Sequence, residues 1–281
     1  MMITQNMSLD PNIAIPMFAI WIGLMIAGII LFIKKRISYR NGIILYFLSA
    51  IFAGFVLGGT PNTIAPIQQI LASIKMGSPL QIIIPFLLML LGLLLTSLFI
   101  GRLFCGFACP LGALQEMVSR INYKSDIKSQ KHRKKWRLEI PKKYTKTIRW
   151  LFFVLIIFLF SIWNIAVIQM LNPFVGFSII QNPEIHIYSI PVISLMVIMI
   201  ASIFVYRPWC RLLCPYGALS SLFSRFSKYE LSRTDACTNC GLCEKICPTK
   251  EAEVNADKSE CYFCRRCIEV CPHEALRLQK V

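Results

Sequence analysis

The sequence predicts an all-α, polytopic membrane domain followed by a small α+β domain. Three observations support this division. Hydrophobic residues make up 56% of the 281 positions, several uncharged runs are long enough to cross a bilayer, and eight of the 12 cysteines lie between positions 237 and 271. A soluble domain with a polar surface would carry less apolar sequence than this.

Five apolar runs predict about five transmembrane helices. A hydrocarbon core of roughly 30 Å requires about 20 mostly apolar residues in helical form. The second run is short and contains glycine, and the fifth is short and begins near Pro191. The runs cover residues 13–33, 42–58, 80–100, 150–171 and 188–206.

Lysine and arginine in the connections predict the orientation of these helices. Four basic residues follow the first run and twelve lie in residues 120–149, between the third run and the fourth, whereas residues 59–79 contain only Lys75 and residues 172–187 contain none. Short cytoplasmic loops are enriched in such residues, so the connections after the first and the third run are expected in the cytoplasm. The N-terminus is then expected on the outer side of the inner (cytoplasmic) membrane. The C-terminal domain is then expected in the cytoplasm.

Residues 1–41 are expected to form a membrane anchor. The tail before the first apolar run has no basic residue and no A-x-A cleavage site follows the run, which disfavours a cleaved signal peptide. The basic loop over 122–149 is expected to contact anionic headgroups of the lipid bilayer. Each basic residue near the surface contributes about 1 kcal/mol of binding free energy to such a contact. Nucleic acid is not expected as a partner.

Two segments of equal spacing reveal an internal repeat. FCGFACPLGAL at 104–114 and WCRLLCPYGAL at 209–219 share Cys-x3-Cys-Pro and Gly-Ala-Leu, and each follows an apolar run. The repeats cover about 42–121 and 150–226. Both run in the same direction, so a pseudo-twofold axis along the membrane normal should relate them and bring both motifs together at the cytoplasmic interface.

The four cysteines of these motifs are predicted to act together. The proline after each motif suits the first turn of a helix, where the helix dipole favours thiolate, and Arg102, Arg207 and Arg211 are expected to strengthen that effect. An additional iron–sulfur cluster or another soft metal is one use of such thiolates. A redox disulfide and inert buried cysteines are the alternatives. The residues are Cys105, Cys109, Cys210 and Cys214.

The C-terminal domain, 233–281, carries two four-cysteine runs. CTNCGLCEKICP and CYFCRRCIEVCP both follow C-x2-C-x2-C-x3-C-P, which is typical of bacterial ferredoxins with two [4Fe–4S] clusters, where the fourth cysteine of each run ligates the other cluster. Zinc is the alternative for grouped cysteines. One predicted ligand set is Cys237, Cys240, Cys243 and Cys271, and the other is Cys261, Cys264, Cys267 and Cys247.

Charge separates this domain from the membrane part. From position 233 onward the sequence has eight basic and eight acidic residues, so the formal net charge of +16 belongs to the rest of the chain. About 50 residues can hardly build a core unaided. The domain is therefore expected to depend on its clusters for folding.

The doubled Cys-x3-Cys-Pro after membrane helices, followed by a double ferredoxin run, resembles the NapH/NosR/CcoG group of membrane-bound 4Fe-4S proteins. The resemblance covers about 42–281 and is nearest to NapH-like members in size. It implies quinol-linked electron transfer toward a partner enzyme. NosR-like members add a flavin-binding domain and CcoG-like members a longer C-terminal region, and this sequence shows neither.

The sequence contains no motif for covalent haem, nicotinamide or covalent flavin. It contains no C-x-x-C-H for covalent c-type haem, no G-x-G-x-x-G after a strand and no flavinylation motif. The three histidines, His132, His186 and His273, never share a membrane helix, which disfavours a bis-histidine haem. His186 is expected to be an exposed loop residue, with assistance to quinol deprotonation as the alternative.

The sequence therefore predicts a membrane-bound iron–sulfur electron-transfer protein. Electrons would pass between the quinone pool, or a redox partner such as a ferredoxin-like subunit, cytochrome or reductase, and clusters at the cytoplasmic face. An enzymatic role would be that of a quinol-linked oxidoreductase subunit. An accessory factor that reduces or delivers a metal for a respiratory metalloenzyme is one alternative, and a redox sensor is another.

Overall fold

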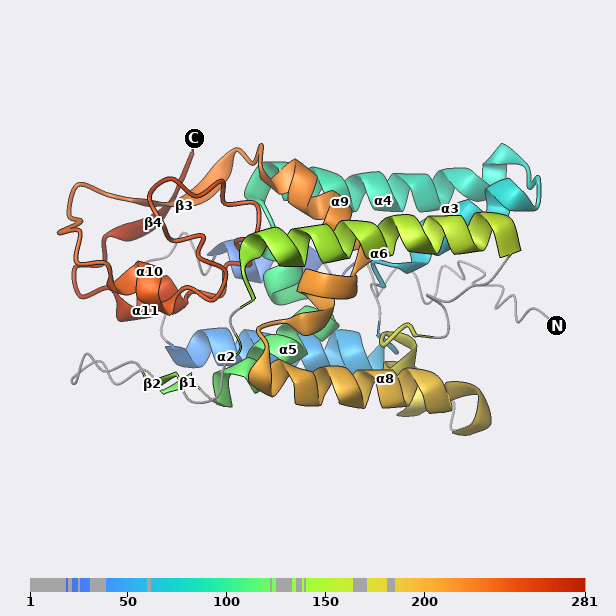
Figure 1. The fold of residues 1–281 in the computed structure, drawn as a ribbon, viewed down its shortest axis with the longest axis horizontal. Helices are drawn as coiled ribbons and strands as arrows, with labels where there is room; N and C mark the ends of the chain where they lie inside the picture. The colour runs from blue at the N-terminus through green and yellow to red at the C-terminus, as the bar shows by residue number, and fades with distance from the viewer. Residues whose placement is uncertain are drawn as a thin grey trace.

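The computed structural model describes residues 19, 22–24, 26–30, 39–59, 62–121, 123–124, 133–134, 138, 140–163, 171–180 and 185–280. In this part of the chain, long helices run along the longest axis of the molecule and the cysteine-rich domain sits at one end of them (Figure 1). The first apolar run, 13–33, lies mostly outside the described residues. Its described positions 22–24 and 26–30 are helical.

The first half of the membrane domain ends in the first cysteine motif. Helix α2 passes without a break into the π-helix η1, and the hairpin of α3 and α4 follows. Helix α3 occupies a connection that the sequence analysis left without structure, and Lys75 at its end donates to the carbonyls of Phe160 and Ser161 at 3.0 and 3.1 Å. The elements are α2 (Tyr39–Leu48), η1 (Ser49–Val56), α3 (Ala65–Lys75), α4 (Leu80–Ile100), η2 (Phe104–Ala108) and α5 (Pro110–Ile121).

The second half begins at α6 and also ends in a cysteine motif followed by a short helix. Helix α6 begins eight residues earlier than the apolar run at 150, because the basic residues before the run continue the helix. The elements are α6 (Lys142–Trp163), the 3-10 helix η3 (Val175–Ile180), α8 (Ile185–Phe204), the π-helix η4 (Trp209–Leu213) and α9 (Pro215–Ser224). A two-residue hairpin in the basic loop, β1 (Tyr123–Lys124) with β2 (Arg133–Lys134), was not expected.

Among the described residues, two helices are long and apolar enough to cross a bilayer. These are Leu80–Ile100 and Lys142–Ile162, and only 17% of the apolar window of each is buried inside the protein. Gly42–Val56 and Ile190–Phe204 are shorter apolar helices. Apolar helices that leave most of their surface uncovered suit a lipid environment, which indicates a membrane protein.

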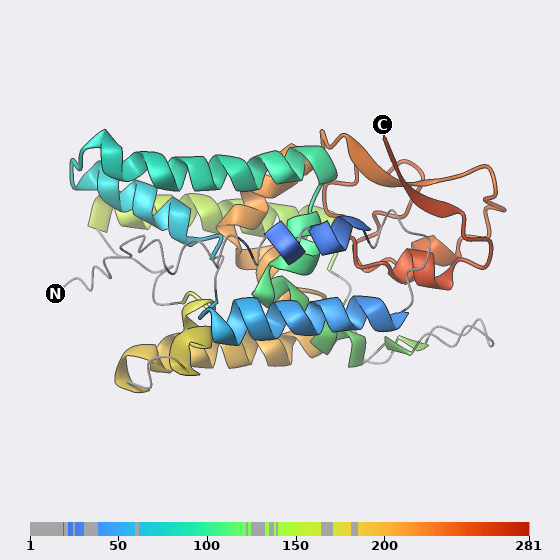
Figure 2. The ribbon, with the colours of Figure 1, turned by 180° about the vertical axis from the view of Figure 1, so that it is seen from behind.

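The helices form two layers with the cysteine motifs between them. Helices α4 and α6 lie on one side and α2 and α8 on the other, and the views from front and back agree (Figures 1 and 2). The short helices after the motifs exchange partners: α5 packs against α2, η1 and α8, whereas α9 packs against α6 and α4. Each short helix therefore contacts the first long helix of its own half and the last long helix of the other half.

The C-terminal domain is small and mixed, as the sequence predicts. Strand β3 (Tyr229–Arg233) pairs antiparallel with β4 (Leu276–Lys280), with Leu231 opposite Leu278. The short helices α10 (Leu242–Ile246) and α11 (Arg266–Val270) pack against each other. One apolar core continues from the helices into this domain through Tyr262 and Phe263, so the domain is docked onto the bundle rather than tethered to it.

Candidate functional site

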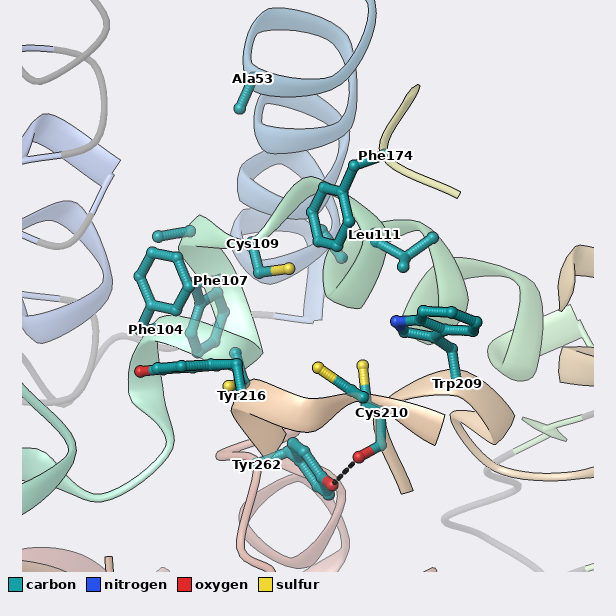
Figure 3. Close-up of a cluster of buried hydrophobic side chains, with 14 of the residues drawn as sticks. Ala53, Phe104, Phe107, Cys109, Leu111, Phe174, Trp209, Cys210, Tyr216 and Tyr262 are labelled. Carbon is teal, nitrogen blue, oxygen red and sulfur yellow. Dashed lines mark hydrogen bonds between the residues drawn. The ribbon is translucent and has the colours of Figure 1, made fainter. Parts of the chain in front are cut away.

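The four cysteines of the two membrane motifs line one cavity. These residues are between 5 and 7% exposed, and the cavity that they line is small. Figure 3 shows Cys109 and Cys210 facing each other across it, with Phe174, Leu111, Trp209 and Tyr216 around them. We call this space, lined by Cys105, Cys109, Cys210 and Cys214, the membrane-side cavity.

The two motifs fold in the same way. Each forms one π-helical turn that ends on the second cysteine, which is extended (φ −77°, ψ 118° at Cys109; φ −72°, ψ 116° at Cys214), and a helix starts at the next proline. The backbone N–H of each second cysteine donates at 2.9 Å to the carbonyl of the first residue of the turn. Single π-turns occur often at functional sites, and here they direct both cysteines of a motif to the same side.

The glycine of the shared Gly-Ala-Leu has a packing role. A Cβ on Gly112 would lie 2.2 Å from the carbonyl oxygen of Cys105, and one on Gly217 would lie 2.9 Å from that of Cys210. In both motifs the start of the short helix therefore touches the backbone of the first cysteine. This contact explains why the sequence repeats glycine at these two positions.

Arg102 and Arg207 favour the thiolate form of Cys105, as the sequence predicts, but burial has the larger effect on the pKa of these cysteines. Burial raises the pKa of Cys105 to about 11 and that of Cys214 to about 12, although Arg102 opposes the shift at Cys105. Arg211 instead donates to the carbonyl of Ile140 at 3.2 Å. Four thiolates in this cavity would therefore require a metal centre that binds them directly.

The segments expected outside the membrane reach this cavity. Thr63 and Phe174 belong to the connections 59–79 and 172–187, and both line it. Each follows an asparagine whose side-chain oxygen accepts a backbone N–H two residues on, at 3.0 Å for Asn62 and 3.1 Å for Asn172. The cavity is thus lined by residues of both connections as well as by both motifs.

The eight cysteines of the C-terminal domain line two further cavities. The distal tail cavity is small and is lined by Cys237, Cys240, Cys243 and Cys271. The proximal tail cavity is larger, because it extends along β3, and it is lined by Cys247, Cys261, Cys264 and Cys267. In each cavity, three cysteines come from one run and the fourth from the other run, which are the two ligand sets that the spacing predicts.

The donor sets fit iron–sulfur clusters better than single ions. Among the described residues no group of three or more His, Cys, Asp and Glu is placed to hold one metal ion. A [4Fe–4S] cluster takes one thiolate per iron, so it needs four sulfurs spread around a larger space. The membrane-side cavity presents four cysteine sulfurs, and the distal tail cavity presents four cysteine sulfurs together with His273.

The three cavities lie in a row and share lining residues. Tyr262 lines both the membrane-side cavity and the proximal tail cavity. Arg233 and Leu276 line both tail cavities. Tyr262 is 2% exposed, and a Cβ on Gly106, beside Cys105, would lie 2.4 Å from its carbonyl oxygen. The C-terminal domain therefore touches the first membrane motif directly.

Two buried carboxylates hold the C-terminal domain in this position. Glu116 of α5 accepts from Arg266 of the domain at 2.9 Å and from Arg207 and Arg120 at 3.2 Å. In the opposite direction, Glu260 of the domain accepts from Arg149 at 2.6 Å and from Arg102 at 3.1 Å. These ion pairs lower the pKa of Glu260 to about 2 and keep both carboxylates charged. Sequence reasoning missed both of them.

The duplicated arginines also join the two halves of the membrane domain. Arg102 donates to the carbonyl of Gly217 at 2.7 Å, and Arg207 donates to that of Cys105 at 2.6 Å. Each arginine thus reaches from its own half to the cysteine motif of the other half. Of the histidines, His273 is exposed and lines the distal tail cavity, while His132 and the side chain of His186 lie outside the described part.

Comparisons with known proteins identify both cysteine-bearing regions. A family described as 4Fe-4S binding domain matches residues 82–139 and 189–233, and a second family with the same description matches 233–250 and 254–277. The fold and these matches define a class: a membrane-associated protein with a ferredoxin-type 4Fe-4S domain. No solved structure matches the chain.

The curated relatives place the chain within that class. YccM of Escherichia coli (strain K12), a proposed electron transport protein, is 32% identical over 66% of this chain, and the chain spans 53% of its length. MJ0750 of Methanocaldococcus jannaschii is 30% identical over 64% of the chain and 73% of its own length. The ferredoxin-type protein NapH of E. coli is 22% identical over 63% of the chain and 61% of its own length. The chain belongs to the NapH/NosR-type family of 4Fe-4S ferredoxin proteins.

Proposed function

We propose that this protein carries electrons between a membrane redox partner and cytoplasmic iron–sulfur clusters. Relatives named for electron transport and ferredoxin function support an iron–sulfur electron-transfer role. The observation that carries the proposal is the row of three four-cysteine cavities joined by shared lining residues. Bound iron–sulfur clusters would supply one-electron chemistry at each position.

The ligand sets follow from the cavities. Cys237, Cys240, Cys243 and Cys271 would hold one [4Fe–4S] cluster, and Cys247, Cys261, Cys264 and Cys267 would hold the second. A third centre, an iron–sulfur cluster or another metal, would bind to Cys105, Cys109, Cys210 and Cys214. The protein's own contribution is to bury the four membrane-motif cysteines and to keep the membrane-side and proximal tail cavities in contact through Tyr262.

The membrane arrangement is part of the proposal. We infer about five transmembrane helices in two parallel repeats, 42–121 and 150–226, after an anchor over 1–41. The partner exchange of α5 and α9 and the crossed bonds of Arg102 and Arg207 support a pseudo-twofold relation. The multi-pass domain would lie in the inner membrane with the basic loop 122–149 and the C-terminal domain, 233–281, in the cytoplasm.

A quinone is the proposed membrane partner. The membrane-side cavity is lined by residues of the two connections assigned to the outer side of the membrane and by Tyr262 of the C-terminal domain. A centre in this cavity would therefore lie between the bilayer and the tail clusters, where it could accept electrons from a quinol in the bilayer. A redox protein is the second partner. A role in metal delivery gains no support from the relatives, whose names describe ferredoxin-type and electron-transport proteins.

Reduction by a soluble quinol analogue tests the function. Anaerobic, detergent-solubilised protein should show reduction of its tail clusters on mixing with the quinol, followed by EPR. Cys210→Ser should abolish that reduction while both tail clusters stay intact. Equal reduction rates in the wild type and in this variant would contradict the role of the membrane-side cavity, and no reduction by any quinol in the wild type would contradict the proposed partner.

A further inference from the structure

Trp209 brings an unpaired hydrogen-bond donor to the membrane-side cavity. The side chain is 2% exposed, and its indole N–H has no partner among the described residues. Its ring lines the cavity, and Figure 3 shows the indole nitrogen at the edge of the ring nearest the sulfur of Cys210. An unpaired donor in such a place costs about 1–3 kcal/mol, so an acceptor is expected inside the cavity.

The first motif has no such donor. The position that matches Trp209 is Phe104, which lies edge-on to Tyr216 with ring centroids 6.0 Å apart. If the side chain at position 209 only filled space, phenylalanine could do so as it does in the first motif, without an N–H that needs an acceptor. The two motifs agree in backbone shape and in both cysteines, so this difference makes the polar surroundings of the cavity unequal on its two sides.

A second donor lies on the same side as Trp209. Gln115 accepts from the backbone N–H of Trp209 at 3.2 Å and donates to the sulfur of Cys210 at 3.5 Å. The matching position in the second repeat is Ser220, whose hydroxyl donates to the carbonyl of Gly217 instead. Gln115 therefore fixes the backbone of Trp209 and reaches the neighbouring cysteine at the same time.

We propose that the indole N–H of Trp209 donates a hydrogen bond to a sulfur of the centre held by the four membrane-motif cysteines and raises its reduction potential. The inference rests on the proposed function, because it needs that centre. Hydrogen bonds to cluster sulfurs stabilise the reduced, more negative state and so raise the potential. Gln115 acts in the same direction from the Cys210 side. Trp209 is a positioning and tuning residue and forms no bond to the metal.

The substitution Trp209→Phe tests the proposal, because it keeps an aromatic ring and removes the donor. The full chain would be titrated anaerobically with EPR detection, and the signal of this centre would be identified by its loss in Cys210→Ser. The midpoint potential of this centre should fall by about 59 mV, which corresponds to a change of about tenfold in the equilibrium constant of a one-electron couple. The tail clusters should keep their midpoints. Trp150→Phe, in α6, where the ring packs edge-on against Phe153, is the matched control and should change nothing.

A second measurement keeps the proposal falsifiable if the variant does not fold. Wild-type protein with ¹⁵N-labelled tryptophan, reduced at the centre, should show a hyperfine coupling to one indole nitrogen in pulsed EPR, and Trp150→Phe should retain it. An unchanged midpoint in Trp209→Phe together with no coupling would overturn the tuning role while the centre stands. A wild-type protein without any signal that depends on Cys210 would overturn the proposed centre itself.

Discussion

Replacing Glu116 with glutamine should release the C-terminal domain from the membrane bundle. The carboxylate is fully buried and forms ion pairs with three guanidinium groups, those of Arg120, Arg207 and Arg266. Breaking a buried ion pair by removing one partner costs about 3–5 kcal/mol, because the remaining charge stays buried without compensation. At 1.4 kcal/mol per factor of ten, the docking equilibrium should weaken on the order of 10²–10³-fold.

Hydrogen exchange in lipid nanodiscs measures this change. Amides in the contact between the motif around Gly106 and the segment around Tyr262 should lose protection in Glu116→Gln, since local opening sets their exchange. A double-mutant cycle with Arg266→Met should give a coupling energy of about 0.5–3 kcal/mol, as expected for residues in contact. This coupling separates the ion pair from general loss of packing.

Lys146→Met is the matched control for this experiment. Lys146 pairs with Asp257 of the C-terminal domain at 3.9 Å, but the two side chains are 36 and 32% exposed. An exposed pair of this kind contributes about 1 kcal/mol or less. If Glu116→Gln lost no more protection than Lys146→Met, the reasoning that buried carboxylates hold the domain in place would be refuted.

Three further predictions concern acid stability, orientation and cluster content. Ion pairs lower the pKa of Glu260 from its usual 4.5 to about 2, so its stabilisation is complete above pH 4.5 and disappears as the pH falls to about 2. The difference in Tm between wild type and Glu260→Gln should follow that window; a difference already absent at pH 5 would contradict it. Cysteines introduced at the exposed positions Met76 and Val254 should react with an impermeant maleimide from outside and from the cytoplasm, respectively, and the reverse pattern would invert the orientation. Cys240→Ser and Cys264→Ser should each lose about four iron atoms by iron assay, whereas unchanged iron would argue against these ligands.

Sequence patterns were informative where the physical signal is local. Apolar length gave the positions of the described long helices within a few residues, except that α6 starts at Lys142 because basic residues can extend a helix beyond the lipid. Cysteine spacing grouped the C-terminal residues in the same sets that line the two tail cavities. Number of spans and orientation depend on lipid and on residues outside the described part, and they stay predictions.

Ion pairs and hydrogen bonds between segments far apart in the chain leave no comparable pattern in the sequence. Arg102 and Arg207 are matched in the sequence and do oppose the rise in the pKa of Cys105, as predicted, but their ion pairs left no sequence signal. The structure pairs them with Glu260 and Glu116 and with carbonyls of the opposite half. One clue was available, because Glu116 is an isolated acidic residue in the segment that leads into a strongly basic loop. Its three partners lie up to 150 positions away, and only the fold brings them together.

Mössbauer spectroscopy of anaerobically purified, ⁵⁷Fe-enriched protein tests the central claim, that the chain holds three four-cysteine redox centres. The wild type would be compared with a variant in which Cys105, Cys109, Cys210 and Cys214 are all serine. We expect two [4Fe–4S] clusters, about eight iron atoms, in both proteins and an additional iron–sulfur component in the wild type alone. Stoichiometric zinc in place of iron, or identical spectra from the two proteins, would contradict the account.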